Sequence, residues 1–217
     1  MPSRGRWRGS STSSAAFTID AVSGTGPRRV SRSRSTRSPR TRTACGPRIL
    51  ADLSLTLHQA GRGEQAAATA ARARALAEAA ADRHAQAQAH NLLGVLASGA
   101  GRLDVARAEL ERSLALAEEL DDASARAAAL NNLALVARAA GELDRALELT
   151  EEALKLCAAQ GDRHREAALE TNLADLHHAA GRSAESMEHL KRAVAIFSEV
   201  GPDEDTRLPE IWKLVSW

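Results

Sequence analysis

Hydrophobic and small residues recur along the chain with a period of forty residues. An Ala-Gly pair marks each period, and its glycines are Gly61, Gly101, Gly141 and Gly181. A leucine stands eight residues before each glycine, at Leu53, Leu93, Leu133 and Leu173. A small residue stands five residues after each glycine, at Ala66, Ala106, Ala146 and Ser186. A fixed period of this length is the signature of a repeat architecture, so the sequence predicts four copies of one structural unit.

A second break divides each period into two elements of about 18 residues, a length typical of helices. The breaks are at Ala81-Asp82, Asp121-Asp122, Gly161-Asp162 and Gly201-Pro202. Within the third copy, apolar residues at i, i+3, i+4 and i+7 predict a buried helical stripe. Its members are Leu130, Leu133, Ala134 and Ala137. The same spacing places the other residues of this segment on the opposite side, namely Asn131, Asn132, Leu135 and Arg138.

The breaks carry residue types that end and begin helices. Glycine accepts the left-handed backbone conformation that ends a helix. Acidic side chains favour helix N-termini, and Asp82, Asp122 and Asp162 stand where a first helix is expected to begin. Equal helices joined by short loops form antiparallel hairpins, and one such hairpin cannot bury its apolar face alone. We therefore predict an all-α protein, a right-handed α-α superhelix of about four stacked hairpins plus a C-terminal capping helix.

Charge divides the chain near residue 47. The segment before this point has ten arginines and one acidic residue, a net charge of +9, whereas the rest of the chain carries −8. Its low apolar content predicts a disordered tail, because little hydrophobic burial would offset the entropy lost on ordering. The expected organisation is a tail over residues 1–47, repeats over 48–201 (48–81, 82–121, 122–161 and 162–201) and a C-terminal cap over 202–217.

Three interpretations of the basic tail stay open. Its charge suits an arm that binds nucleic acid or an acidic partner. Its Arg- and Ser-rich, acid-poor composition matches a transit peptide in part, although it lacks amphipathic periodicity. The third interpretation, which we favour, is a start codon assigned too far upstream in a GC-rich gene.

Composition agrees with helices and argues against β-rich folds. The chain has 47 alanines and 27 leucines, but no tyrosine and only five Phe and Trp residues together. Its two cysteines, Cys45 and Cys157, lie in unlike contexts and offer neither a disulfide framework nor a metal-binding pair. No apolar run approaches the roughly 18 residues that a membrane-spanning helix needs. We expect a soluble, cytoplasmic chain without a membrane partner.

The repeat resembles the tetratricopeptide repeat. The resemblance rests on Leu-Gly or Leu-Ala in the first helix, glycine at the turn, and small residues five and twelve positions later, with the copy from Asn91 to Ser113 the nearest match. The forty-residue period and the missing Trp, Tyr and Pro depart from the common form of about 34 residues. These departures are similar to the long-helix variants in kinesin light chains, bacterial regulators and nucleotide-dependent signalling ATPases.

The resemblance implies a partner-binding surface on the first helices, which line the concave face of such arrays. Asparagine side chains donate and accept hydrogen bonds, so a ladder of them suits the backbone of an extended peptide, with apolar neighbours as pockets. The candidate partner-binding residues are Asn91, Leu92, Val95, Asn131, Asn132, Leu135, Arg138, Asn172, Asp175 and His178. The alternative is that these asparagines are solvated or bond to neighbouring helices.

The sequence offers little for catalysis. The seven histidines are scattered without an HExxH motif or Cys/His grouping, and no GxxxxGK[ST] loop occurs. We therefore expect no enzyme activity, metal site, cofactor or small-molecule substrate. The charge of −8 on the repeats favours a neutral or basic partner and disfavours nucleic acid.

We expect a noncatalytic protein-protein interaction scaffold that binds a peptide or protein on the concave face. Two alternatives stay open. The chain could be the C-terminal sensory or regulatory part of a larger bacterial transcriptional regulator or signalling ATPase. It could also bind nucleic acid through the basic tail.

Overall fold

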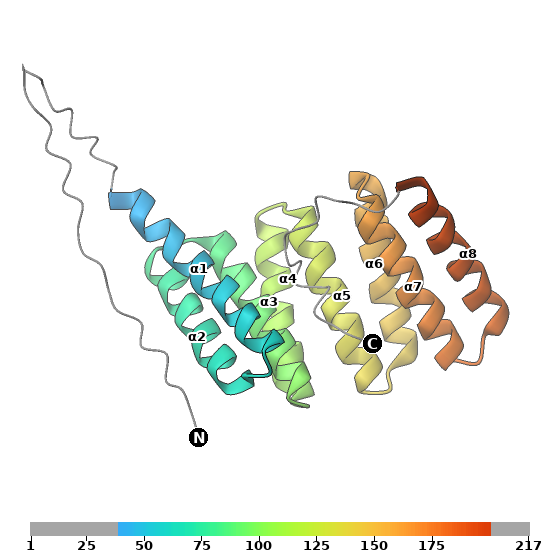
Figure 1. Ribbon diagram of the computed structural model, residues 1–217, viewed down its shortest axis with the longest axis horizontal. Coiled ribbons are helices and arrows are strands. Elements are labelled where there is room, and N and C mark those ends of the chain that lie inside the picture. The colour runs from blue at the N-terminus through green and yellow to red at the C-terminus, as the bar shows by residue number, and fades with distance from the viewer. Residues whose placement is uncertain (1–38, 201–217) are drawn as a thin grey trace, which may run out of the picture. The chain divides into compact units, whose positions relative to one another are not determined.

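The computed structural model describes residues 39–200, which form eight helices joined by short turns (Figure 1). The helices are α1 Pro39–Gln59, α2 Gly63–Ala79, α3 Arg83–Gly99, α4 Leu103–Glu119, α5 Ala123–Ala139, α6 Leu143–Gln160, α7 Arg163–Ala179 and α8 Ser183–Val200. Helix α1 begins at Pro39 and contains Pro47, so it starts ahead of the expected beginning of the repeats at residue 48. The tail up to residue 38 and the predicted cap over 202–217 lie outside the described residues.

The helices pair into four antiparallel hairpins, α1–α2, α3–α4, α5–α6 and α7–α8, and the second helix of each hairpin packs on the first helix of the next. First helices also contact each other directly, α1 with α3 and α3 with α5. A first helix is therefore covered on several sides. This arrangement is an all-α, right-handed superhelix, which confirms the predicted fold class.

Aspartate caps begin the first helices of the last three hairpins, as the sequence predicted. The carboxylates of Asp82, Asp122 and Asp162 each accept a hydrogen bond from the backbone N–H three residues later, at 3.0, 2.9 and 3.1 Å. Each carboxylate satisfies an N–H group that has no partner within its own helix. The second helices α2, α4 and α6 have no such side-chain cap.

All the turns from Gly61 to Gly181 share one left-handed position. Glycine occupies it within each hairpin, as predicted, with φ between 72° and 81°. Between hairpins, Gly161 has φ 69°, whereas Ala81 and Asp121 adopt φ 51° without being glycine. Left-handed backbone costs a residue with a Cβ about 1–2 kcal/mol. The two kinds of turn thus have the same backbone shape but different residues.

Small residues allow the two helices of a hairpin to approach closely. A Cβ added to Gly94 on α3 would lie 2.5 Å from Cγ of Leu110 and 3.2 Å from the carbonyl oxygen of Ala106 on α4. Ala106 itself is fully buried. A small residue of the first helix and the alanine five residues past the turn therefore lie in close contact.

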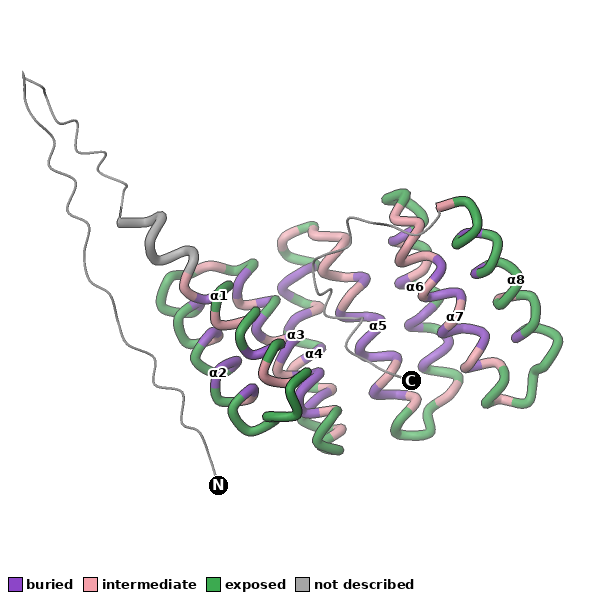
Figure 2. Tube along the Cα trace, viewed as in Figure 1, coloured by how far each residue is buried: buried purple, intermediate pink, exposed green. Residues whose placement is uncertain are grey.

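The apolar core runs along the stack in two clusters. The smaller one joins α1, α2 and α3, and the larger one extends from the end of α3 to α7. Burial is greatest in α3 and α5, the first helices of the second and third hairpins, whereas most of α8 is exposed (Figure 2). None of the helices within residues 39–200 has the length and apolar character needed to cross a bilayer.

Candidate functional site

Asparagine side chains form a ladder along the first helices. The Asn132 side-chain amide on α5 donates a hydrogen bond of 2.9 Å to Oδ1 of Asn91 on α3. One hairpin later, the Asn172 amide on α7 donates one of 2.8 Å to Oδ1 of Asn131 on α5. All four residues are at least nine-tenths buried. The asparagines therefore tie successive hairpins together.

This arrangement corrects the expected placement of the polar residues. The predicted partner-binding residues that are buried are Asn91, Leu92, Val95, Asn131, Asn132 and Asn172. Of the remaining four, Leu135, Arg138 and Asp175 are half-buried and His178 is exposed. The expectation of an opposite, open side was wrong for Asn131 and Asn132, because neighbouring first helices cover it. The alternative, that the asparagines bond to neighbouring helices, is the one observed.

A shallow depression, partly open to solvent, lies where α5, α6 and α7 meet. Its walls are Ala134, Leu135 and Arg138 from α5, Thr150 from α6, and Asn172 and Leu176 from α7. The lining combines aliphatic surface, a guanidinium group and an amide. The space it encloses is about the size of one water molecule, so a partner would lie across it, against its aliphatic and polar rim, and would not insert a side chain.

The depression brings together three of the ten predicted residues, Leu135, Arg138 and Asn172. Sequence reasoning missed Leu176 and Thr150. Leu176 is one turn after Asn172 and was open to prediction from helical spacing. Thr150 belongs to a second helix, and its hydroxyl donates a hydrogen bond to the carbonyl of Ala146. Nothing in its sequence context indicates that it lies beside the first helices.

Two buried carboxyl-imidazole contacts lie inside hairpins, at repeat-equivalent positions. In the second hairpin, Nδ1 of His90 is 2.6 Å from Oε2 of Glu109. In the fourth hairpin the residue types are exchanged, and Nδ1 of His189 is 2.7 Å from Oε2 of Glu170. Both contacts join the two helices of a hairpin. Because the histidine lies on the first helix in one hairpin and on the second helix in the other, we interpret both as packing contacts between the two helices of a hairpin.

A further histidine extends the contact in the fourth hairpin. The ring of His177 stacks on that of His189, with centroids 5.0 Å apart and planes 11° from parallel. Nδ1 of His177 is buried and has no hydrogen-bond partner within residues 39–200. Desolvation lowers the pKa of His177, and the nearby His189 and Arg182 lower it further.

Other reactive groups do not gather into a site. Burial raises the pKa of the Cys157 thiol to about 11, so the nucleophilic thiolate is scarce at neutral pH. Among the residues that the structure describes, no group of three His, Cys, Asp or Glu side chains is placed to hold a metal ion.

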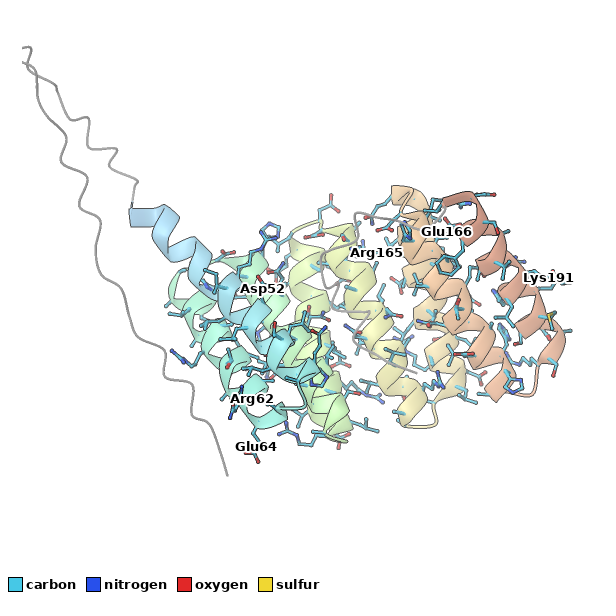
Figure 3. The ribbon with its side chains drawn as sticks, viewed as in Figure 1. Asp52, Arg62, Glu64, Arg165, Glu166 and Lys191 are labelled. Carbon is cyan, nitrogen blue, oxygen red and sulfur yellow. The ribbon has the colours of Figure 1, made fainter. Side chains whose placement is uncertain are left out.

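Ion pairs instead lie along the edges of the stack. At the start of α7, the guanidinium Nε of Arg165 is 3.0 Å from the Asp162 carboxylate, and its other end donates to the Ser124 hydroxyl at the start of α5 (Figure 3). Arg107 on α4 pairs with Glu142 in the next hairpin at 2.6 Å. These contacts join neighbouring hairpins.

The sequence of the last two hairpins identifies the repeat. Residues 125–199 match the family model described as "Tetratricopeptide repeat". Residues 125–199 carry tetratricopeptide repeats. No curated protein sequence matches the chain.

Solved tetratricopeptide structures share the fold at low sequence identity. A putative kinesin light chain from Podospora anserina with nearly identical repeats is 21% identical, with a TM-score of 0.61 over 73% of this chain and 78% of that one. The Rap protein complexed with Competence and Sporulation Factor is 14% identical, with a TM-score of 0.68 over 73% and 44%. A signal transduction ATPase with a tetratricopeptide repeat sensor, from Pyrococcus horikoshii, is 15% identical, with a TM-score of 0.67 over 75% and 25%.

Proposed function

We propose that the chain is a noncatalytic scaffold that binds an extended peptide or protein segment along its first helices. The observation that carries this proposal is the depression between α5 and α7, which combines Leu135 and Leu176 with Arg138 and Asn172. The similarity to the Rap protein complexed with Competence and Sporulation Factor supports it, because that structure shows the same fold holding another molecule.

The chemistry of the depression sets the kind of segment. An aliphatic side chain of the partner would lie mainly against the half-buried Leu135, because Leu176 is only 3% exposed, and would bury apolar surface there. The Arg138 guanidinium would donate to a carbonyl or carboxylate oxygen beside that side chain. The role of the asparagine ladder is to hold α3, α5 and α7 in fixed relative positions, so that the binding surface is formed before the partner arrives.

A library of random peptides displayed on phage tests the proposal. Peptides selected on the full chain should share a bulky aliphatic residue and lose most of their binding to the Leu135→Glu variant, because a carboxylate would replace the apolar wall. Arg138→Ala should weaken binding less. Binding is measured by titrating a fluorescent copy of a selected peptide, with helicity checked by circular dichroism.

Val105→Glu provides the matched control. Val105 is an exposed apolar residue of α4 outside the lining of the depression, so the same change there should leave binding intact. Peptides that bind Leu135→Glu as well as the unchanged chain would move the site elsewhere. A library that yields no binder to the folded chain would count against a peptide-binding role.

A further inference from the structure

The free side of α8 carries an exposed apolar stripe. Its members are Met187, Leu190, Val194 and Phe197, between 39% and 64% exposed. Their spacing of three, four and three residues places them on one helical face. Lys191 lies on the same side of α8 and projects away from the stack (Figure 3). Four large apolar residues on one helix face are more than a folded surface usually leaves uncovered.

The stripe occupies positions at which earlier second helices contact the next hairpin, each position being seen in one of them. At the Met187 position, Arg107 pairs with Glu142 of the next hairpin. At the Val194 position, Arg74 pairs with Glu109 at 3.4 Å. At the other two positions, Thr150 lies beside Asn172 and Leu176 of α7, and the Ala77 carbonyl accepts a hydrogen bond from Gln86 of α3. The α8 stripe is therefore a stacking face that no described hairpin covers.

At the opposite end of the stack, α1 exposes the face that a first helix uses to pack against a preceding second helix. Ile49 and Leu53 on α1 are 63% and 47% exposed. Three periods later, Leu169 and Leu173 on α7 occupy the equivalent positions and are 1% exposed. Those two leucines belong to the apolar cluster formed with α5 and α6, so they face the preceding hairpin. Ile49 and Leu53 thus present the surface that would pack against a preceding second helix.

The positions that form the asparagine ladder also recur at the two ends of the stack. Each rung joins a residue to the one 41 positions later, as in Asn131 with Asn172. Thr171 follows Asn131 in this series and has a half-buried hydroxyl that donates to the Ala167 carbonyl. On α1, Asp52 occupies the position of Asn172 and is exposed (Figure 3). A threonine hydroxyl has a single hydrogen, so Thr171 would form the next rung by turning that hydrogen from the Ala167 carbonyl to the Asp52 carboxylate.

The repeat frame decides which helix fits the α8 stripe. Continued in the same frame, the chain itself would place Pro209 and Lys213 where α7 has Leu169 and Leu173. Proline is unfavourable inside a helix, and a buried lysine needs a partner for its charge. Helix α1 instead offers Ile49 and Leu53 at these positions.

We propose that α8 of one copy of this chain packs against α1 of a second copy, so that the chain assembles head to tail. The contact reproduces the α6–α7 junction between molecules, with Ile49 and Leu53 of the second copy on the stripe around Val194. It joins two different surfaces, so an open assembly keeps one free α1 face and one free α8 face and can add further copies. This assembly leaves the depression between α5 and α7 uncovered.

The full chain tests this by size-exclusion chromatography with light scattering over a wide range of concentrations. The average mass should rise with concentration. Val194→Glu and Ile49→Glu should each abolish the rise, because each places a carboxylate in one half of the contact. Both residues are exposed, so the helicity of each variant should be unchanged. Leu76→Glu, at an exposed position on α2, is the matched control and should leave the assembly intact.

Mixing the two blocked variants gives the sharpest result. Ile49→Glu retains its α8 face and Val194→Glu retains its α1 face, so the mixture should form a complex of two copies that grows no further. Two results would overturn the proposal. One is a monomer at every concentration, as expected if residues 202–217 cap α8. The other is an Ile49→Glu variant that still dimerises alone, which would indicate a symmetric contact through α8.

Discussion

The third hairpin (α5–α6) and the fourth (α7–α8) have the same backbone arrangement. They differ in the side chains that lie between their two helices. At one pair of equivalent positions the third hairpin has Leu130 and Leu149, both part of the larger apolar cluster. The fourth hairpin has Glu170 and His189 there, joined at 2.7 Å. The forty-residue frame therefore requires that the two side chains complement each other, and it leaves open whether they do so by apolar contact or by hydrogen bonding.

The two hairpins also differ in how they are covered. The third is packed between neighbours on both sides, whereas α8 of the fourth has one free side. A change at the same repeat position should consequently have unequal effects in the two hairpins. The most deeply buried apolar pair should be the most sensitive, and contacts near the exposed end should respond more weakly.

The largest effect is expected from Leu130→Ala. Leu130 is 1% exposed, and its truncation removes apolar contacts and leaves a cavity, so the free energy of unfolding should fall by about 2–5 kcal/mol. Urea denaturation followed by circular dichroism measures the change. The control Leu76→Ala, at a 47% exposed position, should shift it by no more than about 0.5 kcal/mol. Equal losses in the two variants would mean that the third hairpin lacks the tight core described above.

In the fourth hairpin, His189→Leu should destabilise the protein by about 1–3 kcal/mol, because the buried Glu170 carboxyl group loses its hydrogen-bond partner. The double variant Glu170→Leu/His189→Leu copies the arrangement of the third hairpin. It should recover most of the lost stability or exceed it, since replacing a buried polar pair by well-packed apolar residues is often neutral or stabilising. Chemical denaturation of both variants gives the comparison, and a double variant less stable than the single one would refute the equivalence of the two pairs.

The turns that enter the two hairpins provide a smaller contrast. Gly161, before the fourth hairpin, has φ 69°, and a Cβ there would meet nothing within 4 Å. Gly161→Ala should therefore destabilise by about 1 kcal/mol through backbone conformation alone. Asp121 adopts φ 51° in the turn before the third hairpin, so Asp121→Gly should give a smaller change of opposite sign. Thermal unfolding measures both, and a loss of stability in Asp121→Gly would indicate that its side chain has an unrecognised role.

Periodicity predicted the elements of the fold because glycine corners and aspartate caps act locally. Gly101 and Asp122 act only on residues a few positions away in the sequence. Their spacing was therefore enough to predict the helices, the turns and the hairpins. The buried stripe around Leu133 followed from helical spacing for the same reason.

The candidate site was harder to predict because it depends on contacts between hairpins. Helical spacing separates Asn131 and Asn132 from the leucine stripe, but it does not show that a neighbouring first helix covers them. The amide of Asn132 bonds to a residue 41 positions away, and Thr150 reaches the depression from a different helix. To place Asn132 and Thr150, one must know how neighbouring hairpins stack, and the sequence of a single repeat does not contain this information.

The smallest expected effect is a pH dependence that the fourth hairpin has and the third lacks. His177 stands where the second and third hairpins have Ala97 and Ala137. Its pKa is lowered by desolvation and by the neighbouring His189 and Arg182, effects that Glu185 and Glu151 oppose only in part. The unfolded chain therefore binds a proton at this position more readily than the folded one.

As the pH falls through the ordinary histidine value of about 6.5, the unfolded state takes up this proton first, and the free energy of unfolding decreases. His177→Ala adopts the residue of the second and third hairpins and should remove this part of the acid-induced loss. Leu76→Ala provides the control, because it changes an exposed side chain that does not titrate and should leave the slope of stability against pH unchanged. Urea denaturation at neutral and mildly acidic pH measures the slopes. If His177→Ala retained the full acid-induced loss, the proton-sensitive group would have to be another one, and the buried Glu170–His189 contact would be the next to vary.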